Sequence, residues 1–128
     1  MYDRRDSARD PSGERSIAVE VYVVVNKIMS GREAMGIFST PGKAREHTDR
    51  FAGKTGYVCR IERSFVRGYY EPPHHLFAAH TYDGREDVHV LEGVYGELSQ
   101  ARRAAGREGE IIEFSIDSPG ENQVFMNE

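Results

Sequence analysis

The sequence has few of the residues on which whole classes of protein depend. Its 128 residues include a single cysteine, Cys59, and no tryptophan. One cysteine excludes an internal disulfide, a cysteine-based zinc framework and a redox pair. This composition suits a reducing compartment, so we expect a cytoplasmic protein, inside a bacterium or a host cell.

Long apolar runs are also missing. The longest, Val21 to Val25, is far shorter than the roughly 20 residues that cross a bilayer. Residues 1–16 hold four acids and four arginines without an apolar stretch, so they do not form a signal peptide. We expect a soluble protein that does not bind membranes, with residues 1–16 as a flexible N-terminal arm.

An excess of positive charge is absent as well. The net charge is −4, which argues against general nucleic-acid binding, because that depends on neutralising phosphates. The charge is unevenly distributed. Residues 54–82 contain four bases and two acids, giving +2, so the rest of the chain carries −6. An anionic ligand is therefore expected near residues 54–82.

What the sequence does contain is a pattern that occurs twice. The first copy consists of Ser30-Gly31-Arg32-Glu33, Gly36-Ile37-Phe38 and Lys43-Ala44-Arg45. The second consists of Asp83-Gly84-Arg85-Glu86, Gly93-Val94-Tyr95 and Gln100-Ala101-Arg102. The turn glycine and the next glycine are five positions apart in the first copy, Gly31 to Gly36, and nine in the second, Gly84 to Gly93. The second hairpin should therefore project further. Such self-similarity predicts two folding units that cover each other's apolar faces.

Local patterns predict the same elements in each copy. In the first, apolar alternation and turn signals indicate strands at 17–29, 34–39 and 57–66. Thr40-Pro41 is a helix start, and the helix should end at Gly53. In the second, we expect strands at 75–82, 88–95 and 111–117, with a helix at 96–107.

The predicted fold class is α+β. Two strand-strand-helix-strand (ββαβ) repeats, residues 17–67 and 74–117, are joined by residues 68–73 into one domain, residues 17–117. We expect a mostly antiparallel six-stranded sheet with two helices. Residues 118–128 are predicted to be a C-terminal tail, whose apolar Val124-Phe125-Met126 can dock on the sheet or on a neighbour.

The best candidate binding surface is the segment at the joint between the repeats. Cations that meet phosphates and rings that stack on bases occur together in nucleotide sites, although the same residues are common in protein interfaces. The candidate residues are Arg60, Arg63, Arg67, Tyr69, Tyr70, His74 and His75. Lys43 is added because it lies at the start of the first helix, where free N–H groups attract anions.

Catalytic and metal-binding motifs are not evident. The sequence has no nucleophile elbow and no glycine-rich phosphate loop. His75 and His80, five positions apart on one predicted strand, should face opposite sides, and no suitably spaced partner ligand is apparent. We therefore expect no enzyme, no metal and no cofactor. An enzyme would require His74, His75 or His80 to converge with a carboxylate such as Glu71 or Asp83.

The hairpin, the Gly-Ile/Val-Phe/Tyr step and the short Ala/Arg helix, at Gly36 to Arg45 and Gly93 to Arg102, resemble small uncharacterised prokaryotic and phage proteins with a ββαβ unit. This resemblance implies an accessory protein of a bacterium or its virus, and it supplies no catalytic residues.

From these observations we expect a non-enzymatic interaction or regulatory protein that forms a homo-oligomer. It would bind a protein partner or an anionic, nucleotide-like ligand at the joint, for example to interfere with a host factor. Two alternatives stay open: a small histidine-dependent phosphoesterase, and a minor structural or assembly component of a phage particle.

Overall fold

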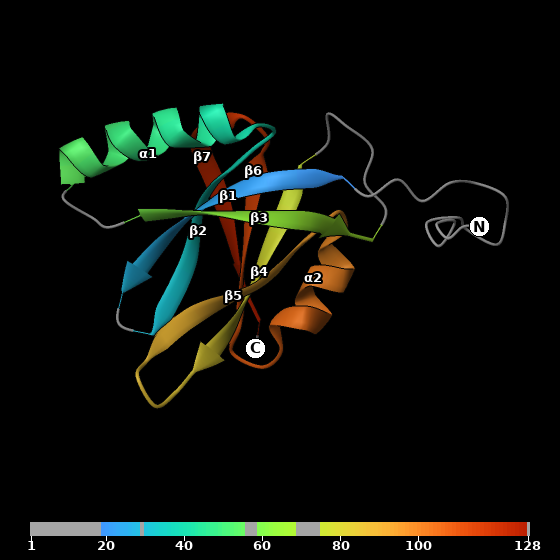
Figure 1. The fold of residues 1–128 in the computed structure, drawn as a ribbon. Helices are drawn as coiled ribbons and strands as arrows, with labels where there is room; N and C mark the ends of the chain where they lie inside the picture. Colours follow the sequence, from blue (N-terminus) through green and yellow to red (C-terminus); the bar gives the residue numbers. More distant parts are fainter. Residues whose placement is uncertain (1–18, 29, 56–58, 69–74, 128) are drawn as a thin grey trace, which may run out of the picture.

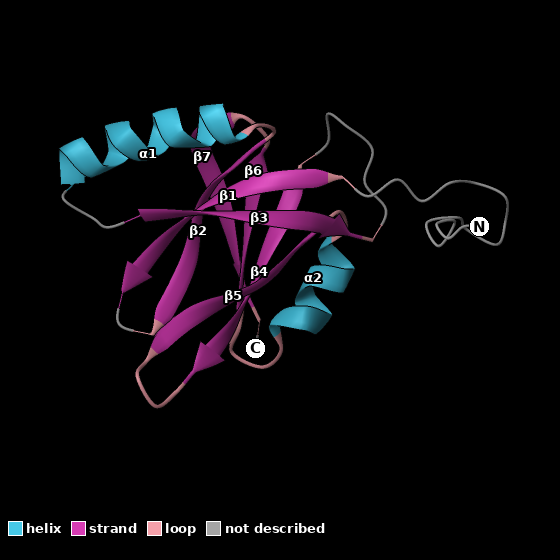
Figure 2. Cartoon of the chain, in the orientation of Figure 1, coloured by secondary structure: helices cyan, strands magenta, loops and turns pink. Residues whose placement is uncertain are grey.

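The computed structural model describes residues 19–28, 30–55, 59–68 and 75–127, so the predicted arm at 1–16 lies outside the described residues. Within them, nine elements follow one another (Figures 1 and 2). They are β1 (Glu20–Ile28), β2 (Gly31–Phe38), α1 (Pro41–Thr55), β3 (Cys59–Arg67), β4 (Leu76–Asp83), β5 (Val88–Tyr95), α2 (Leu98–Ala105), β6 (Glu110–Ser115) and β7 (Ser118–Met126). Neither helix in the described ranges has the length and apolar character needed to cross a bilayer.

The strands form one mixed sheet in the order β2-β1-β3-β5-β4-β6-β7. The first strand of each half is central: β1 pairs antiparallel with β2 and β3, and β4 pairs antiparallel with β5 and β6. The halves meet where β3 and β5 run parallel, at Val66 and Val94. Strand β5 also pairs with β2, at Arg32 and Val90, so the sheet curls back on itself. In the part of the chain that the structure describes, the fold is α+β with two helices, as predicted.

The sheet has seven strands, and the six-stranded prediction missed β7. This strand lies antiparallel to β6 after a tight turn in which Asp117 takes a positive φ of 63°. Its first residues, Ser-Pro-Gly-Glu-Asn, have low strand propensity, which hid the strand from pattern analysis. Pairing with β6 and contact of Phe125 with the α2 cluster hold β7 in place.

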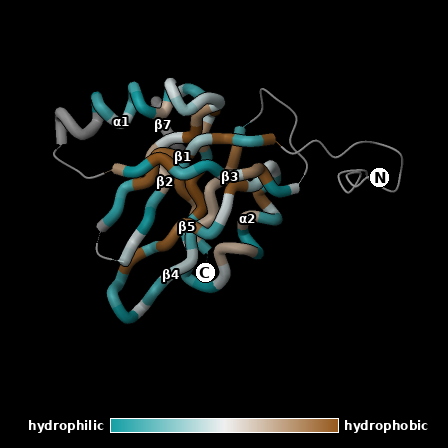
Figure 3. The backbone as a smooth tube through the Cα atoms, viewed as in Figure 1, coloured by the Kyte–Doolittle hydropathy of each residue, from teal (hydrophilic) through white to brown (hydrophobic). Residues whose placement is uncertain are grey.

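Apolar side chains on opposite faces of the sheet form separate clusters. Val21, Val23 and Val25 of β1 join Leu76 and Ala78 of β4 in the main core between the halves. On the other face of β1, Val24 packs with Phe38 and with Ala44 of α1. Helix α2 buries Ala101 and Ala105 against Ala79 and Ile111. In Figure 3, the hydrophobic segments of the backbone are concentrated where the strands cross.

Both hairpins contain a bulge at a glycine. The β1–β2 register shifts between Val24 and Val25, opposite Gly36, and the β4–β5 register shifts between Ala79 and His80, opposite Gly93. Gly36 follows the first residue of β2, Gly31, at the same spacing as Gly93 follows the first residue of β5, Val88. The extra length of the second copy therefore lies in the turn, at residues 84–87.

The helix bounds differ from the predicted ones. Helix α1 continues past Gly53 to Thr55, which a single glycine in a helix permits at modest cost. Helix α2 is shorter than expected and ends at Gly106, whose φ of 72° suits glycine and breaks the helical path.

Candidate functional site

Of the eight residues predicted to bind a partner or ligand, the structure describes five. Tyr69, Tyr70 and His74 lie outside the described residues. Arg60, Arg63 and Arg67 lie on β3, and Arg60 is exposed. The other described candidates, Lys43, Arg63, Arg67 and His75, each pair with a different carboxylate, so these four side chains do not converge on a common point.

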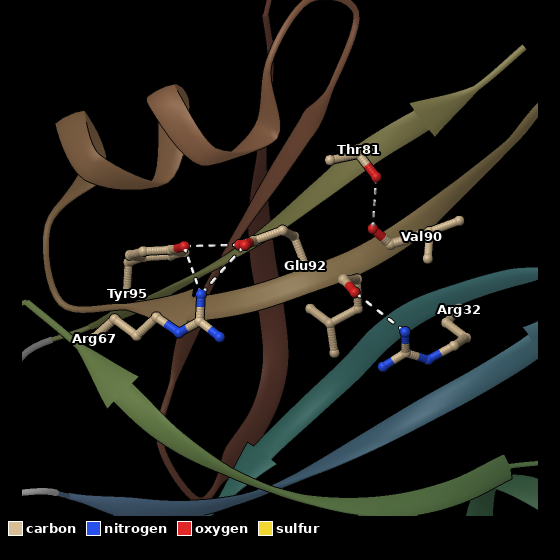
Figure 4. Close-up of polar contacts among 7 residues, drawn as sticks. Arg32, Arg67, Thr81, Val90, Glu92 and Tyr95 are labelled. Carbon is tan, nitrogen blue, oxygen red and sulfur yellow. Dashed lines mark hydrogen bonds and ion pairs between the residues drawn. The ribbon is translucent and has the colours of Figure 1, made fainter.

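Arg67 is held in a hydrogen-bonded group at the joint (Figure 4). Its Nη1 donates to Glu92 Oε2 and to the Tyr95 hydroxyl, both at 3.2 Å. The Tyr95 hydroxyl in turn donates to Glu92 Oε1 at 2.7 Å. Burial and the Glu92 contact raise the pKa of Tyr95, so the hydroxyl keeps its proton. The guanidinium charge is thus already neutralised within the protein.

Phe65 lies between Arg63 and Arg67 on the same face of β3, because alternate strand residues share a face. Phe65 also shares this face with Cys59 and Ile61, which pack against the α1 cluster, yet 49% of it is exposed. Helix α1 explains the difference, because its cluster reaches Cys59 and Ile61 but not the far end of β3. Arg63 forms an ion pair with Glu20, at 3.1 Å, beside this ring. We call Arg63, Phe65, Arg67, Glu92 and Tyr95 the joint surface.

Lys43 faces an internal anion. The Asp117 carboxylate accepts from the Ser39 N–H and hydroxyl, both at 2.7 Å, and from Lys43 Nζ at 3.2 Å. Partial burial alone raises the pKa of Asp117, but these donors outweigh it, and the pKa is lowered. The start of α1, where an external anion was expected, therefore already has the protein's own carboxylate beside it.

His75, directly before β4, and His80, within β4, have different partners. His75 Nδ1 pairs with Glu113 at the surface. His80 is fully buried; its Nε2 accepts the Ala34 N–H at 3.0 Å, and its Nδ1–H donates to the Glu110 carbonyl at 3.3 Å. Burial lowers the pKa of His80 to about 4. The phosphoesterase alternative requires histidines that converge with a carboxylate. His75 and His80 do not converge, and Glu71 lies outside the described residues.

A cluster that the sequence analysis missed lies at the hairpin end of the sheet. Ligand atoms of Glu33 (β2), His89 (β5) and Glu110 (β6) all lie within 4.8 Å of one another. His89 Nε2 lies 3.3 Å from the Glu108 carbonyl, which can only accept, so Nε2 carries the proton. The other nitrogen, Nδ1, lies 3.9 Å from Glu33 Oε2.

Two oxygens near this cluster have no hydrogen-bond partner. They are Asn26 Oδ1, on a residue only 6% exposed, and Glu110 Oε1. Asn26, Glu33 and His89 line one pocket of about 200 Å³. Desolvation and the neighbouring Glu33 charge raise the pKa of Glu110, partly offset by His89. We call Asn26, Glu33, His89 and Glu110 the hairpin-end cluster.

One sequence signal pointed to this region. Asn26 and His80 interrupt central strands that are otherwise apolar, and a buried polar group needs a partner. The cluster itself could not be recognised, because its residues come from four strands whose order was unknown.

Comparison with known proteins adds no assignment: no family model matches the chain, and neither a curated protein nor a solved structure matches it.

Proposed function

We propose that the protein is a non-enzymatic interaction protein that self-associates and binds a protein partner through the joint surface. The observation that carries this proposal is Phe65, a large aromatic side chain that is 49% exposed on a strand in the middle of the sheet order. Exposed aromatic residues beside arginines have the composition of interface hot spots.

The surroundings of Phe65 favour a protein over an anion. Arg63 and Arg67 are already paired with Glu20 and Glu92. A nucleotide phosphate would have to displace these carboxylates, whereas a protein surface can cover the ring and leave the ion pairs at its rim. The hydrogen bonds around Arg67 also fix its side chain before binding, which lowers the entropy lost on association.

We also propose that the two halves are copies of one ββαβ unit. Support comes from the identical element order, from the central position of β1 and β4, and from the bulges opposite Gly36 and Gly93. A bulge that recurs at the same step of two hairpins is typical of a feature retained from a common unit.

Intact-mass measurement under native conditions tests the interaction proposal. The protein, isolated gently from its own cells, should have the mass of an oligomer, a complex with another protein, or both. The substitution Phe65→Ser should weaken these assemblies at least about tenfold, because hot-spot residues contribute 2 kcal/mol or more.

Val124→Ser is the matched control. Val124 is 51% exposed but lies on β7, outside the joint surface, so its loss should leave the assembly unchanged. A monomeric mass with no partner, or equal weakening by both substitutions, would contradict the proposal.

A further inference from the structure

We propose that the hairpin-end cluster binds one divalent first-row metal ion, such as Zn²⁺ or Mn²⁺, through Glu33, His89 and Glu110, with Asn26 Oδ1 as an additional ligand. This inference is independent of the proposed interaction function. The joint surface lies near Glu20 and the cluster near Asn26, six residues along β1, or about 20 Å.

The donor set fits such an ion. Two carboxylates, one imidazole and one amide oxygen form a mixed oxygen and nitrogen site, which suits Mn²⁺ and Zn²⁺. Their ligand atoms, now within 4.8 Å of one another, need to approach to about 3.4 Å to surround an ion at roughly 2.1 Å. Glu33, whose side chain is 43% exposed, has the freedom to make this adjustment.

His89 is oriented for coordination. Its Nε2 faces the Glu108 carbonyl, 3.3 Å away, which leaves Nδ1 on the side of Glu33. Histidines that bind metals usually donate their other ring N–H to a carbonyl or carboxylate in this way.

The partnerless oxygens are an independent indication. Only 6% of Asn26 is exposed, and the residue lines the pocket with Glu33 and His89. Its Oδ1 accepts no hydrogen bond. Glu110 Oε1 is also without a donor. Leaving such groups unpaired costs about 1–3 kcal/mol each. A single cation among them satisfies both oxygens.

The ligands also come from both halves of the chain. Asn26 and Glu33 belong to the first hairpin, and His89 and Glu110 to the second half. The two hairpin turns are already in contact, since the Ser30 N–H donates to Glu86 at 3.2 Å. A bound ion therefore links the halves and stabilises the folded chain, because the unfolded chain lacks the site.

Metal titration of the full chain tests this proposal. The protein, without a histidine tag and stripped with EDTA, is titrated with Zn²⁺ and separately with Mn²⁺ against a chromophoric chelator. We expect one ion per chain for at least one metal. At a free metal concentration about 100 times Kd, the melting temperature should rise by about 10 °C.

Substitutions then identify the ligands. Glu110→Gln and His89→Gln should each weaken binding at least about 100-fold, more than the loss of a residue that only orients a ligand. Glu33→Gln, at a position whose side chain is 43% exposed, should have the same effect and leave the metal-free protein folded, because it removes one of two adjacent negative charges. Circular dichroism of each metal-free variant confirms the fold.

The matched control is His75→Gln. It removes an imidazole from another His–Glu pair, His75 with Glu113, outside the cluster, and should leave the metal affinity unchanged. The proposal is overturned if the wild type binds no ion at a 1:1 ratio, if Glu33→Gln binds as tightly as the wild type, or if His75→Gln weakens binding as much as His89→Gln.

Discussion

The imidazole of His80 is fully buried, which makes it the most enclosed ionisable group among the described residues. Both ring nitrogens are hydrogen-bonded to backbone groups, one as acceptor from Ala34 and one as donor to Glu110. A protonated ring would set a second N–H against the Ala34 N–H, so the fold requires the neutral form. Burial, which disfavours the charged ring, lowers the pKa of His80 to about 4, in agreement with this requirement.

Stability should consequently decrease in mild acid. The unfolded chain titrates His80 near 6.5, whereas the folded chain does so at about 4, so between these values the unfolded state binds more protons. The stability from His80 is complete above about pH 6.5 and is lost as the pH falls to about 4. The expected loss is on the order of 3 kcal/mol, measured by urea unfolding with EDTA present.

His80→Gln separates this effect from other titrations. Glutamine cannot titrate, so the variant should be less stable at neutral pH but lose less stability between pH 6.5 and 4. Equal acid losses in the variant and the wild type would show that His80 does not cause the decrease.

At the scale of the elements, the connection between α2 and β6 depends on Gly109. A Cβ at this position would lie 2.3 Å from the carbonyl oxygen of Ala105 and 2.7 Å from its carbonyl carbon. These are backbone atoms, which cannot move aside as a side chain can. Gly109 also accepts the Asn127 N–H at 2.9 Å, so a shift here disturbs the end of β7 as well.

Gly109→Ala should therefore reduce the free energy of unfolding by about 1–3 kcal/mol, as overpacking does. Gly42→Ala is the control, since a Cβ there meets nothing within 4 Å and Gly42 lies in the first turn of α1. Alanine favours a helix over glycine, so this change should stabilise by about 0.5 kcal/mol. Chemical denaturation measures the free energy of unfolding of both variants and of the wild type. A Gly109→Ala protein as stable as the wild type would contradict this prediction.

The elements differ in how well the sequence predicted them. The strand at 88–95 was predicted with the bounds it has, because its apolar and β-branched residues are enclosed by turn signals. Strand β7 was missed because tertiary pairing with β6, and not local propensity, holds its polar first half. The exposure of Phe65 could not be predicted from the sequence, since alternation indicates a face of the strand but not where a helix covers it.

The hairpin-end cluster could not be predicted from the sequence for a different reason. Glu33 and His89 are 56 positions apart, and Glu110 follows 21 positions later. Only the strand order and the pairing of β5 with β2 bring them together. Of the joint surface, only Arg63 and Arg67 were named from local composition as candidate binding residues, and in the structure each pairs with one of the protein's own carboxylates.

At the scale of the whole molecule, β7 belongs to the folded domain. Phe125 packs against the α2 cluster, with the Arg102 guanidinium 5.6 Å from its ring centre. Asn127 Nδ2 donates to the carbonyls of Arg102 and Gly106, at 2.8 and 2.9 Å, which satisfies acceptors at the end of α2.

Removal of residues 118–128 should lower the stability by at least about 2 kcal/mol, because it exposes the cluster under Phe125 and removes these hydrogen bonds. The matched control is removal of residues 1–16, whose composition supplies no apolar core. Thermal unfolding of both shortened chains checks the prediction, and an unchanged melting temperature without residues 118–128 would contradict it.

The main core has a consequence for assembly. Because it forms between one face of the first half and one face of the second, the first half of one chain is equally complementary to the second half of another. Two chains can therefore exchange halves and rebuild the same core, with new structure needed only in the connecting segment. Such domain swapping provides a route to a dimer that needs no additional interface, and its yield should increase with protein concentration during refolding.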